Sequence, residues 1–525
     1  LVGSEMCIRD SHEAMGGALE ALIDRLGLSD NPGSEQRVLS SLLLGLLYMF
    51  PGHPRLRWCV SRVTEMLDEE LDAGNKLEAA MMLPAYCNLA VDRDRANVAV
   101  VRGSSLAERS EITPFSRLWW YLRLSLHLTL QGRYEEAIAS ADQADLIART
   151  YGFHHMPTIM SLVWIYRTIA MVAHGDVRGA QISADEVFAA AHCRYAISVC
   201  NVANARVYMQ CATGNDEALA QLGVPCIESA RATGMVYLDA LAQTYHAMGL
   251  ALTQQHAALP ERTESLRSLV RGTCFAHFEI DAALIETWYV LRHERRELGL
   301  EMLRATLVRA RAMDWRPGNL FRATKICREV LAEAIESDVE ADYVTDIIAG
   351  LRLAPPAGAT DRWPWPVRIH ALGRFEVIVD GAPLQFAGKA PRKPLALLKA
   401  IVAMGTNGVP AASLIDVLWP DEEGDAARKS LDVTVGRLRK LLGRSDAILV
   451  SDEAVTLNAK LCWVDAQSFA VLSESATTPA ERRRASGVYA GTFLPGDVDT
   501  PWSARRREQL RSRFVRLVET IGAAA

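Results

Sequence analysis

The stretch RKSLDVTVGRLRKLLG, from Arg428 to Gly443, decides how the C-terminal part of this 525-residue chain is interpreted. It is too regular for a loop, and it carries too many charges for a core helix. Leu431, Val435, Leu438 and Leu442 follow one another at three- and four-residue spacing, which predicts one apolar stripe on an amphipathic helix. We expect that stripe to pack on two preceding helices.

The opposite face of this helix is basic, and Asp425 is placed to cap its N-terminus. A solvated amphipathic helix is the simpler interpretation of these charges when they are considered alone. The helix is, however, expected to come third after a strand-rich segment and before a hairpin, and this position favours insertion into a DNA major groove. The basic face comprises Lys429, Asp432, Val433, Gly436, Arg437 and Lys440, with Arg428 and Arg439 on its flanks.

The segments around this helix predict a small α+β domain. Residues 367–386 alternate in hydrophobicity and contain the hairpin signal Asp380-Gly381. Apolar periodicity predicts helices at Pro394–Met404 and Ala411–Trp419, and Ala447–Leu457 is expected to form an extended pair. A sheet, three helices and a hairpin in this order are typical of a winged helix-turn-helix.

Four segments between about Val367 and Phe469 resemble the DNA-binding domain of the bacterial antibiotic regulatory protein (SARP) family, which is similar to the OmpR/PhoB winged helix. They are VRIHALGRFEVIVDGAPL, RKPLALLKAIVA, LIDVLWPDEEGDAARKSLDVTVGRLRKLLG and CWVDAQSF. The resemblance implies a DNA-binding role for ten residues. Base contacts are expected from Ser430, Asp432, Val433, Thr434 and Arg437, and backbone contacts from Trp419, Arg428, Lys429, Arg439 and Lys440.

Two features of this domain leave alternatives open. Trp419 either donates its indole N–H to a phosphate or is an aromatic residue at the edge of the core. The turn of the expected hairpin reads Ser451, Asp452 and Glu453, whereas the related wing carries basic residues. We therefore expect minor-groove contact to be weak, or to be made by a neighbouring residue such as Lys460.

Beyond this domain, residues 470–525 are expected to form a helical segment. The stretch from Tyr489 to Gly522 resembles the start of the bacterial transcriptional activation domain that follows the winged helix in this family. Leu510, Phe514 and Leu517 predict its buried stripe. The arginine-rich run between residues 505 and 513 is then interpreted as a solvated helix face rather than a nucleic-acid patch.

The N-terminal region, residues 12–352, is periodic at three- and four-residue spacing almost throughout. Residues 119–152 resemble a tetratricopeptide repeat: Gly132 closes a turn, Tyr134 opens the second helix, and Ala137 and Ala141 are small enough for close helix packing. Such hairpins stack into a curved solenoid. Weaker copies are expected around Gly175, Ala180 and Ala184, and around Gly214 and Ala218.

The solenoid has two interpretations, a concave surface for a protein or small inducer and a spacer between domains. Residues 353–366 are rich in proline and predict a linker to the winged-helix domain. The repeats and linker resemble regulators of the maltose-activator (MalT) type. Those carry an ATPase ahead of the repeats, but this chain has no phosphate-binding loop of the sequence G-x-x-x-x-G-K-[ST].

Composition excludes several classes of protein. The formal net charge is −6, so any nucleic-acid surface must be local. The longest apolar run, Val38–Phe50, is shorter than the roughly 20 residues that span a bilayer. The ten cysteines are scattered singly, which suits buried thiols in a reducing cytoplasm. Residues 1–11 resemble a non-native leader from a fragmentary reading frame, and they are excluded from the fold prediction.

The sequence therefore predicts a mainly α protein: a tetratricopeptide-like α-solenoid, a small α+β winged-helix domain and a C-terminal helical segment. We expect a cytoplasmic, sequence-specific transcription regulator. No enzymatic role is expected, because no catalytic motif or cofactor loop occurs in the sequence. The expected partners are double-stranded DNA, RNA polymerase and an inducer or protein at the repeats. We expect no membrane binding, and dimerisation on DNA is left open. The alternative is a repeat-based adaptor whose winged helix no longer binds DNA.

Overall fold

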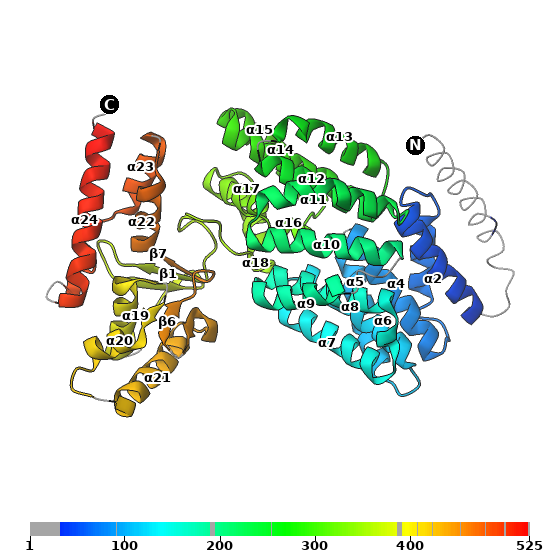
Figure 1. Ribbon diagram of the computed structural model, residues 1–525, viewed down its shortest axis with the longest axis horizontal. Coiled ribbons are helices and arrows are strands. Elements are labelled where there is room, and N and C mark those ends of the chain that lie inside the picture. Colours follow the sequence, from blue (N-terminus) through cyan, green and yellow to red (C-terminus); the bar gives the residue numbers. More distant parts are fainter. Residues whose placement is uncertain are drawn as a thin grey trace. The chain divides into compact units, whose positions relative to one another are not determined.

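The computed structural model describes residues 21, 32–90, 92–189, 195–253, 255–385, 391–406, 408–422, 424–451, 453–477, 479–497 and 500–522. The chain divides into two compact units, Leu1–Leu353 and Ala354–Ala525. It is mainly helical, with small sheets in the C-terminal unit (Figure 1). The expected leader, residues 1–11, lies outside the described residues.

The N-terminal unit is built from helix pairs, in which each helix from α2 to α14 packs on the next one along the chain, as do α16 and α17. Within its described residues there is no strand. The helices are α2 (Pro32–Met49), α3 (Leu56–Glu65), α4 (Ala73–Ala90), α5 (Arg93–Ala107), α6 (Pro114–Leu130), α7 (Tyr134–Thr150), α8 (Pro157–His174), α9 (Val177–Ala189), α10 (Ala196–Thr213), α11 (Asp216–Arg231), α12 (Val236–Leu252), α13 (Leu259–Val270), α14 (His277–His293), α15 (Arg296–Ala312), α16 (Asn319–Ala323), α17 (Lys325–Glu336) and α18 (Ala341–Gly350).

The predicted hairpin at residues 119–152 is the pair α6 and α7. Gly132 has φ +76°, and a Cβ there would lie 2.9 Å from the carbonyl oxygen of Gly350, so only glycine fits this turn. Tyr134 is the first residue of α7, and Ala137 and Ala141 are completely buried. All four features of the predicted repeat are therefore confirmed.

The weaker copies are confirmed in part. Gly175 and Gly214 end α8 and α10 in left-handed conformations, with φ +84° and +70°. Ala180 and Ala184 of α9 are completely buried. Ala218, by contrast, is only partly buried, because it lies in the first turn of α11, where its N–H bonds to the side chain of Asn215.

Helices from the start of the N-terminal unit pack against helices from much later in the chain, which the sequence did not predict. Helix α2 contacts both α4 and α12, and one apolar core joins residues of α2 to α6 with residues of α12 to α14. The backbone N–H of Cys274 donates to the carbonyl of Pro51 over 3.1 Å. The side chain of Arg322, from α16, bonds to the carbonyls of Thr129 and Leu130 at the end of α6.

The C-terminal unit contains two small sheets and a set of helices. One sheet has the order β3-β2-β1-β7 and the other has the order β4-β6-β5. The elements are β1 (Val367–His370), β2 (Glu376–Val379), β3 (Ala382–Pro383), α19 (Arg392–Met404), β4 (Val409–Pro410), α20 (Ala411–Leu418), α21 (Gly424–Leu441), β5 (Ile448–Val450), β6 (Ala454–Leu457), β7 (Cys462–Val464), α22 (Asp465–Ser475), α23 (Pro479–Val488) and α24 (Pro501–Gly522).

The predicted hairpin at Asp380-Gly381 joins β2 to β3. Both residues have positive φ, +46° and +84°, as the turn favoured in two-residue hairpins requires. The predicted extended pair is the antiparallel β5 and β6. The sequence did not predict that β7 would pair in parallel with β1 and so join the two ends of the domain.

The last helices belong to the same core as the sheets, although residues 470–525 were expected to form a separate segment. Leu510 and Leu517 of α24 are buried in the core that also holds Val367 and Leu398, and Phe514 packs against it. This confirms the predicted buried stripe. The proline-rich segment is also packed in part, since Trp365 is buried and its indole N–H donates to Thr360.

The arginine-rich run of α24 is only partly a solvated face. Arg507 donates to the carbonyls of Phe493 and Asp497, and Arg513 donates to the carbonyl of Ala470. These bonds attach α24 to the segments before it. The expectation of a wholly solvated face was wrong for these two residues, because neighbouring carbonyls lie within reach of their guanidinium groups.

Candidate nucleic-acid interface

Helix α21 is held in place by the predicted apolar stripe. Leu431, Val435, Leu438 and Leu442 are at most 3% exposed, and α21 contacts α19 and α20. Burial of each such side chain contributes about 1.5–3 kcal/mol, so this face of the helix is fixed. The helix begins at Gly424, so Asp425 lies in its first turn instead of capping it.

The opposite face of α21 is exposed and basic. Lys429, Asp432, Val433, Arg437 and Lys440 are all exposed there. Among the described residues, no hydrogen bond or ion pair holds the side chain of Lys429, Arg437 or Lys440. Their charges are therefore available to a partner, and both Arg and Lys suit phosphate oxygens or guanine edges.

Three predicted contact residues are instead bonded inside the unit. Thr434 is 5% exposed and its hydroxyl donates to the carbonyl of Ser430, so it belongs to the buried side of α21. Ser430 donates its own hydroxyl to a carboxylate oxygen of Glu422 over 2.6 Å. Arg439 donates through Nε and Nη2 to the carbonyl of Ile448, at 3.0 and 2.7 Å.

The structure thus corrects the expected role of Thr434, because a buried side chain cannot reach a base edge. Arg439 connects α21 to the first strand of the hairpin, a structural role that the sequence did not predict. Glu422 was also missed, since its bond to Ser430 depends on how the loop between α20 and α21 folds back.

Trp419 and Arg428 lie at the edge of the exposed face. Trp419 is 7% exposed, and the ammonium of Lys393 lies 5.1 Å from its ring centroid, within cation–π range. This geometry matches the core-edge alternative for Trp419. Arg428 places Nε 3.5 Å from Oδ1 of Asp432 one turn further along α21, so the acidic residue on the basic face is partly compensated.

The hairpin of β5 and β6 carries no described basic residue at its turn. Ser451 and Glu453 are exposed, whereas Asp452 lies outside the described residues. Lys460 lies in the turn between β6 and β7, beyond the far end of β6. The length of β6 separates Lys460 from the hairpin turn, so of the two alternatives this placement favours weak minor-groove contact.

Gly436 lies in the middle of the exposed face of α21. A Cβ at this position would have no heavy atom within 4 Å, so packing inside the protein does not require a glycine. The residue costs the helix about 1 kcal/mol relative to alanine. One reason for a glycine at this position is that it lets another molecule approach the backbone of α21 closely.

The described residues show no group of His, Cys, Asp or Glu that could hold a metal ion. None of the described helices is both long and apolar enough to cross a lipid bilayer. The described cysteines are unpaired, and burial raises the pKa of the Cys59 thiol to about 11. Cys7 and Cys193 lie outside the described residues.

Comparison with known proteins does not assign this chain to a family. No family model matches the chain, and no curated protein matches it. A matching solved structure is "Crystal structure of NprR in complex with its cognate peptide NprX". The identity is 13%, the match covers 58% of this chain and 85% of that chain, and the TM-score is 0.38. The coordinates themselves define a helical-repeat protein with a small α+β unit at its C-terminal end.

Proposed function

We propose that the C-terminal unit is a winged helix-turn-helix of the SARP and OmpR/PhoB kind, and that the protein is a sequence-specific DNA-binding transcription regulator. In this proposal α21 lies in the major groove, and the hairpin of β5 and β6 is the wing. The order of three helices and a hairpin is the order of such domains.

One observation carries the proposal: α21 is anchored on one side and presents unpaired cations on the other. Its apolar stripe is at most 3% exposed, while Lys429, Arg437 and Lys440 project from the opposite face. A rigid helix with such a face can contact bases and phosphates at the same time.

The predicted contact residues fall into three groups in this proposal. Arg437, Val433 and Asp432 lie on the exposed face and are proposed to contact base edges, Arg437 by a bidentate pair with guanine. Lys429, Lys440 and Arg428 are proposed to bind phosphates. The structure supports positioning roles for the remaining predicted residues, Ser430, Thr434, Trp419 and Arg439, through the internal contacts described above.

The other parts of the proposal follow from the sequence resemblance. The helical repeats bind a small signal or a partner protein, and the regulator activates transcription by contacting RNA polymerase in the cytoplasm. It has no enzymatic activity and no cofactor, and it binds DNA as a monomer or a dimer. The internal cavity of the repeats, described below, supports the role in signal binding.

The test is selection of DNA from a random pool with the full chain, followed by affinity measurements across a salt series. A shorter protein that ends near Ser473 would lack α23 and α24, which contribute to the core of the C-terminal unit. The full chain is therefore used. We expect the selected duplex to bind about a thousandfold or more tightly than a scrambled duplex. Phosphate contacts alone are salt-dependent and do not distinguish sequences.

The second candidate function is a protein-interaction adaptor that has lost DNA binding. Glu453 at the hairpin turn and the net charge of −6 favour it, because both repel phosphates. An affinity ratio near one between selected and scrambled duplex, even with tight binding at low salt, supports the adaptor and rejects the regulator.

A further inference from the structure

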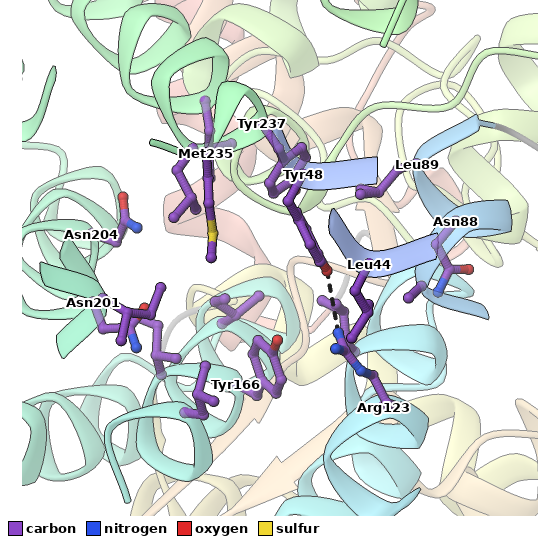
Figure 2. A pocket seen from close by; sticks show the side chains of 18 of the residues that line it. Leu44, Tyr48, Asn88, Leu89, Arg123, Tyr166, Asn201, Asn204, Met235 and Tyr237 are labelled. Carbon is purple, nitrogen blue, oxygen red and sulfur yellow. Dashed lines mark hydrogen bonds between the residues drawn. The ribbon is translucent and has the colours of Figure 1, made fainter. Parts of the chain in front are cut away.

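A cavity of about 450 Å³ lies among the helices of the N-terminal unit. This volume is within the range of about 300–1,000 Å³ that is usual for small-molecule sites. Its walls come from α2, α4, α6, α8, α10 and α12, the first helix of successive pairs (Figure 2). The wall residues are mostly aliphatic and aromatic, as in most sites for small organic ligands.

Arg123 of α6 is the single charged side chain among the described residues that line this cavity. Its Nη1 lies 3.3 Å from the hydroxyl of Tyr48, and its guanidinium carbon lies 6.0 Å from the ring centroid of Trp119. Figure 2 shows this bond, with Tyr166 nearby. Among the described residues, no carboxylate forms an ion pair with Arg123.

Another arginine of the N-terminal unit, the buried Arg322, shows how this protein satisfies a guanidinium that has only a structural role. Arg322 is 2% exposed and donates four hydrogen bonds of 2.8 to 3.2 Å to the carbonyls of Pro317, Thr129 and Leu130. Arg123 makes one long bond to a neutral hydroxyl instead. A guanidinium has five N–H donors, so most of those of Arg123 remain available toward the cavity.

The three asparagines of the wall already make hydrogen bonds within the protein. Asn88 pairs with His127, Asn201 donates to Ser161, and Asn204 contacts the sulfur atoms of two cysteines. Burial lowers the pKa of His127 to about 4, so this histidine is neutral at pH 7. The cavity therefore has a neutral, largely apolar wall with one positive charge.

We propose that this cavity binds a small apolar monocarboxylate, with its carboxylate on Arg123 and Tyr48 and its hydrocarbon body against the aliphatic wall. Arginine forms paired hydrogen bonds with a carboxylate, and a charge-assisted bond is about twice as strong as a neutral one. One cation balances one negative charge. A phosphate monoester would bring a second charge into an apolar site without compensation, which is costly.

The signal-binding role of this site rests on the proposed function, but the binding itself does not. Ligand affinity is measured on the full chain without DNA, so a failure of DNA recognition and a failure of ligand binding are separate results. The site is proposed for the class of apolar monocarboxylates and not for one compound.

The experiment is isothermal titration of the full chain with octanoate, decanoate and dodecanoate, each below its micellar concentration. Decan-1-ol and decyl phosphate test the importance of the charge. The variants are Arg123→Met, which removes the charge and keeps an apolar side chain, and Leu162→Trp, which fills the cavity and leaves Arg123 in place. Arg178→Met, at an exposed arginine of α9, is the matched control.

We expect one molecule of at least one carboxylate to bind per chain, more tightly than decan-1-ol and decyl phosphate. Arg123→Met should weaken carboxylate binding by about tenfold to a hundredfold while leaving decan-1-ol binding unchanged. Leu162→Trp should weaken both, and Arg178→Met neither. If Arg123→Met does not fold, Leu162→Trp and the comparison of decanoate with decan-1-ol in the unaltered protein still test the proposal.

Three results would overturn it. The first is that none of the three carboxylates binds. The second is equal binding of decanoate and decan-1-ol, since the cation would then make no contribution. The third is a preference for decyl phosphate, which would mean that the site accepts a dianion and that its charge balance differs from the one proposed.

Discussion

Two arginines of this chain, one in each unit, use positive charge in opposite ways. In the N-terminal unit, Arg322 is buried and every contact that it makes is to a backbone carbonyl of the same unit. In the C-terminal unit, Arg437 is exposed on α21 and has no bonded partner among the described residues. The difference separates a charge that holds the fold together from a charge that is available to another molecule. Of the four predictions below, three test this distinction and one concerns a buried acid of the N-terminal unit.

The largest effect is expected for Arg322→Met. The change leaves the carbonyls of Leu130 and Pro317 without donors, and each such group costs about 1–3 kcal/mol. The carbonyl of Thr129 loses one of two donors, because it also accepts the backbone N–H of Gly132. The N-terminal unit should lose on the order of 4 kcal/mol in its free energy of unfolding, measured by urea titration. Affinity for a selected DNA duplex should not change. A loss below about 1 kcal/mol would mean that the carbonyls find other donors.

The next effect concerns Asp281, a buried acid of the N-terminal unit. It accepts a hydrogen bond from the indole N–H of Trp315, and burial raises its pKa to about 8. The folded protein therefore holds this proton at pH values where the unfolded chain has released it, so the free energy of unfolding falls as the pH rises from about 4 to 8.

Asp281→Asn keeps the acceptor for Trp315 and removes the titration. The variant should gain stability relative to the original protein by about 1.4 kcal/mol for each pH unit between pH 5 and pH 7. Urea unfolding at three pH values measures the difference, and other titrating groups cancel in it. A difference that is independent of pH would show that Asp281 does not titrate in this range.

A smaller effect is expected for Arg437→Ala, and it lies in DNA binding rather than in stability. If Arg437 contacts a guanine, the variant should lose about 1–3 kcal/mol in affinity and lose discrimination at one base position. Lys440→Ala should weaken binding to all sequences alike and reduce the salt dependence. Arg178→Ala, at an exposed arginine of the repeats, should do neither. An adaptor that does not bind DNA would show no difference among the three variants.

Much of the C-terminal fold was predictable from local patterns. The stripe from Leu431 to Leu442 and the turn at Asp380-Gly381 were predicted because their spacing and residue types depend on near neighbours in sequence. The bond from Arg439 to Ile448 was not predictable, because it depends on where the hairpin lies in space. Thr434 lies three residues after Leu431 and four before Leu438, so helical spacing alone would have assigned it to the buried face, and its expected base contact rested on the family resemblance.

The N-terminal unit shows the same limit on a larger scale. Periodicity predicted the helix pairs, including the glycine turn at Gly132, but not the contact between α2 and α12 that helps to form the cavity. That contact joins residues far apart in sequence. The sequence nevertheless contains one indication of the site, because Arg123 is a lone charge within the apolar run WWYLRLSLHLTL. Its relation to Tyr48 required the structure.

The smallest expected effect, Gly436→Ala, tests the comparison most directly. The added methyl group has open space around it in the free protein, and alanine favours the helix over glycine by about 1 kcal/mol. The C-terminal unit should therefore gain up to about that amount in its free energy of unfolding. If α21 approaches DNA closely at this position, the same methyl group should weaken binding of the selected duplex even though the protein is more stable. Opposite changes in stability and affinity are difficult to explain for a solvated helix, on which alanine should affect stability alone. A gain in stability with unchanged affinity would mean that the groove is occupied by another part of the face, around Arg437 and Lys440.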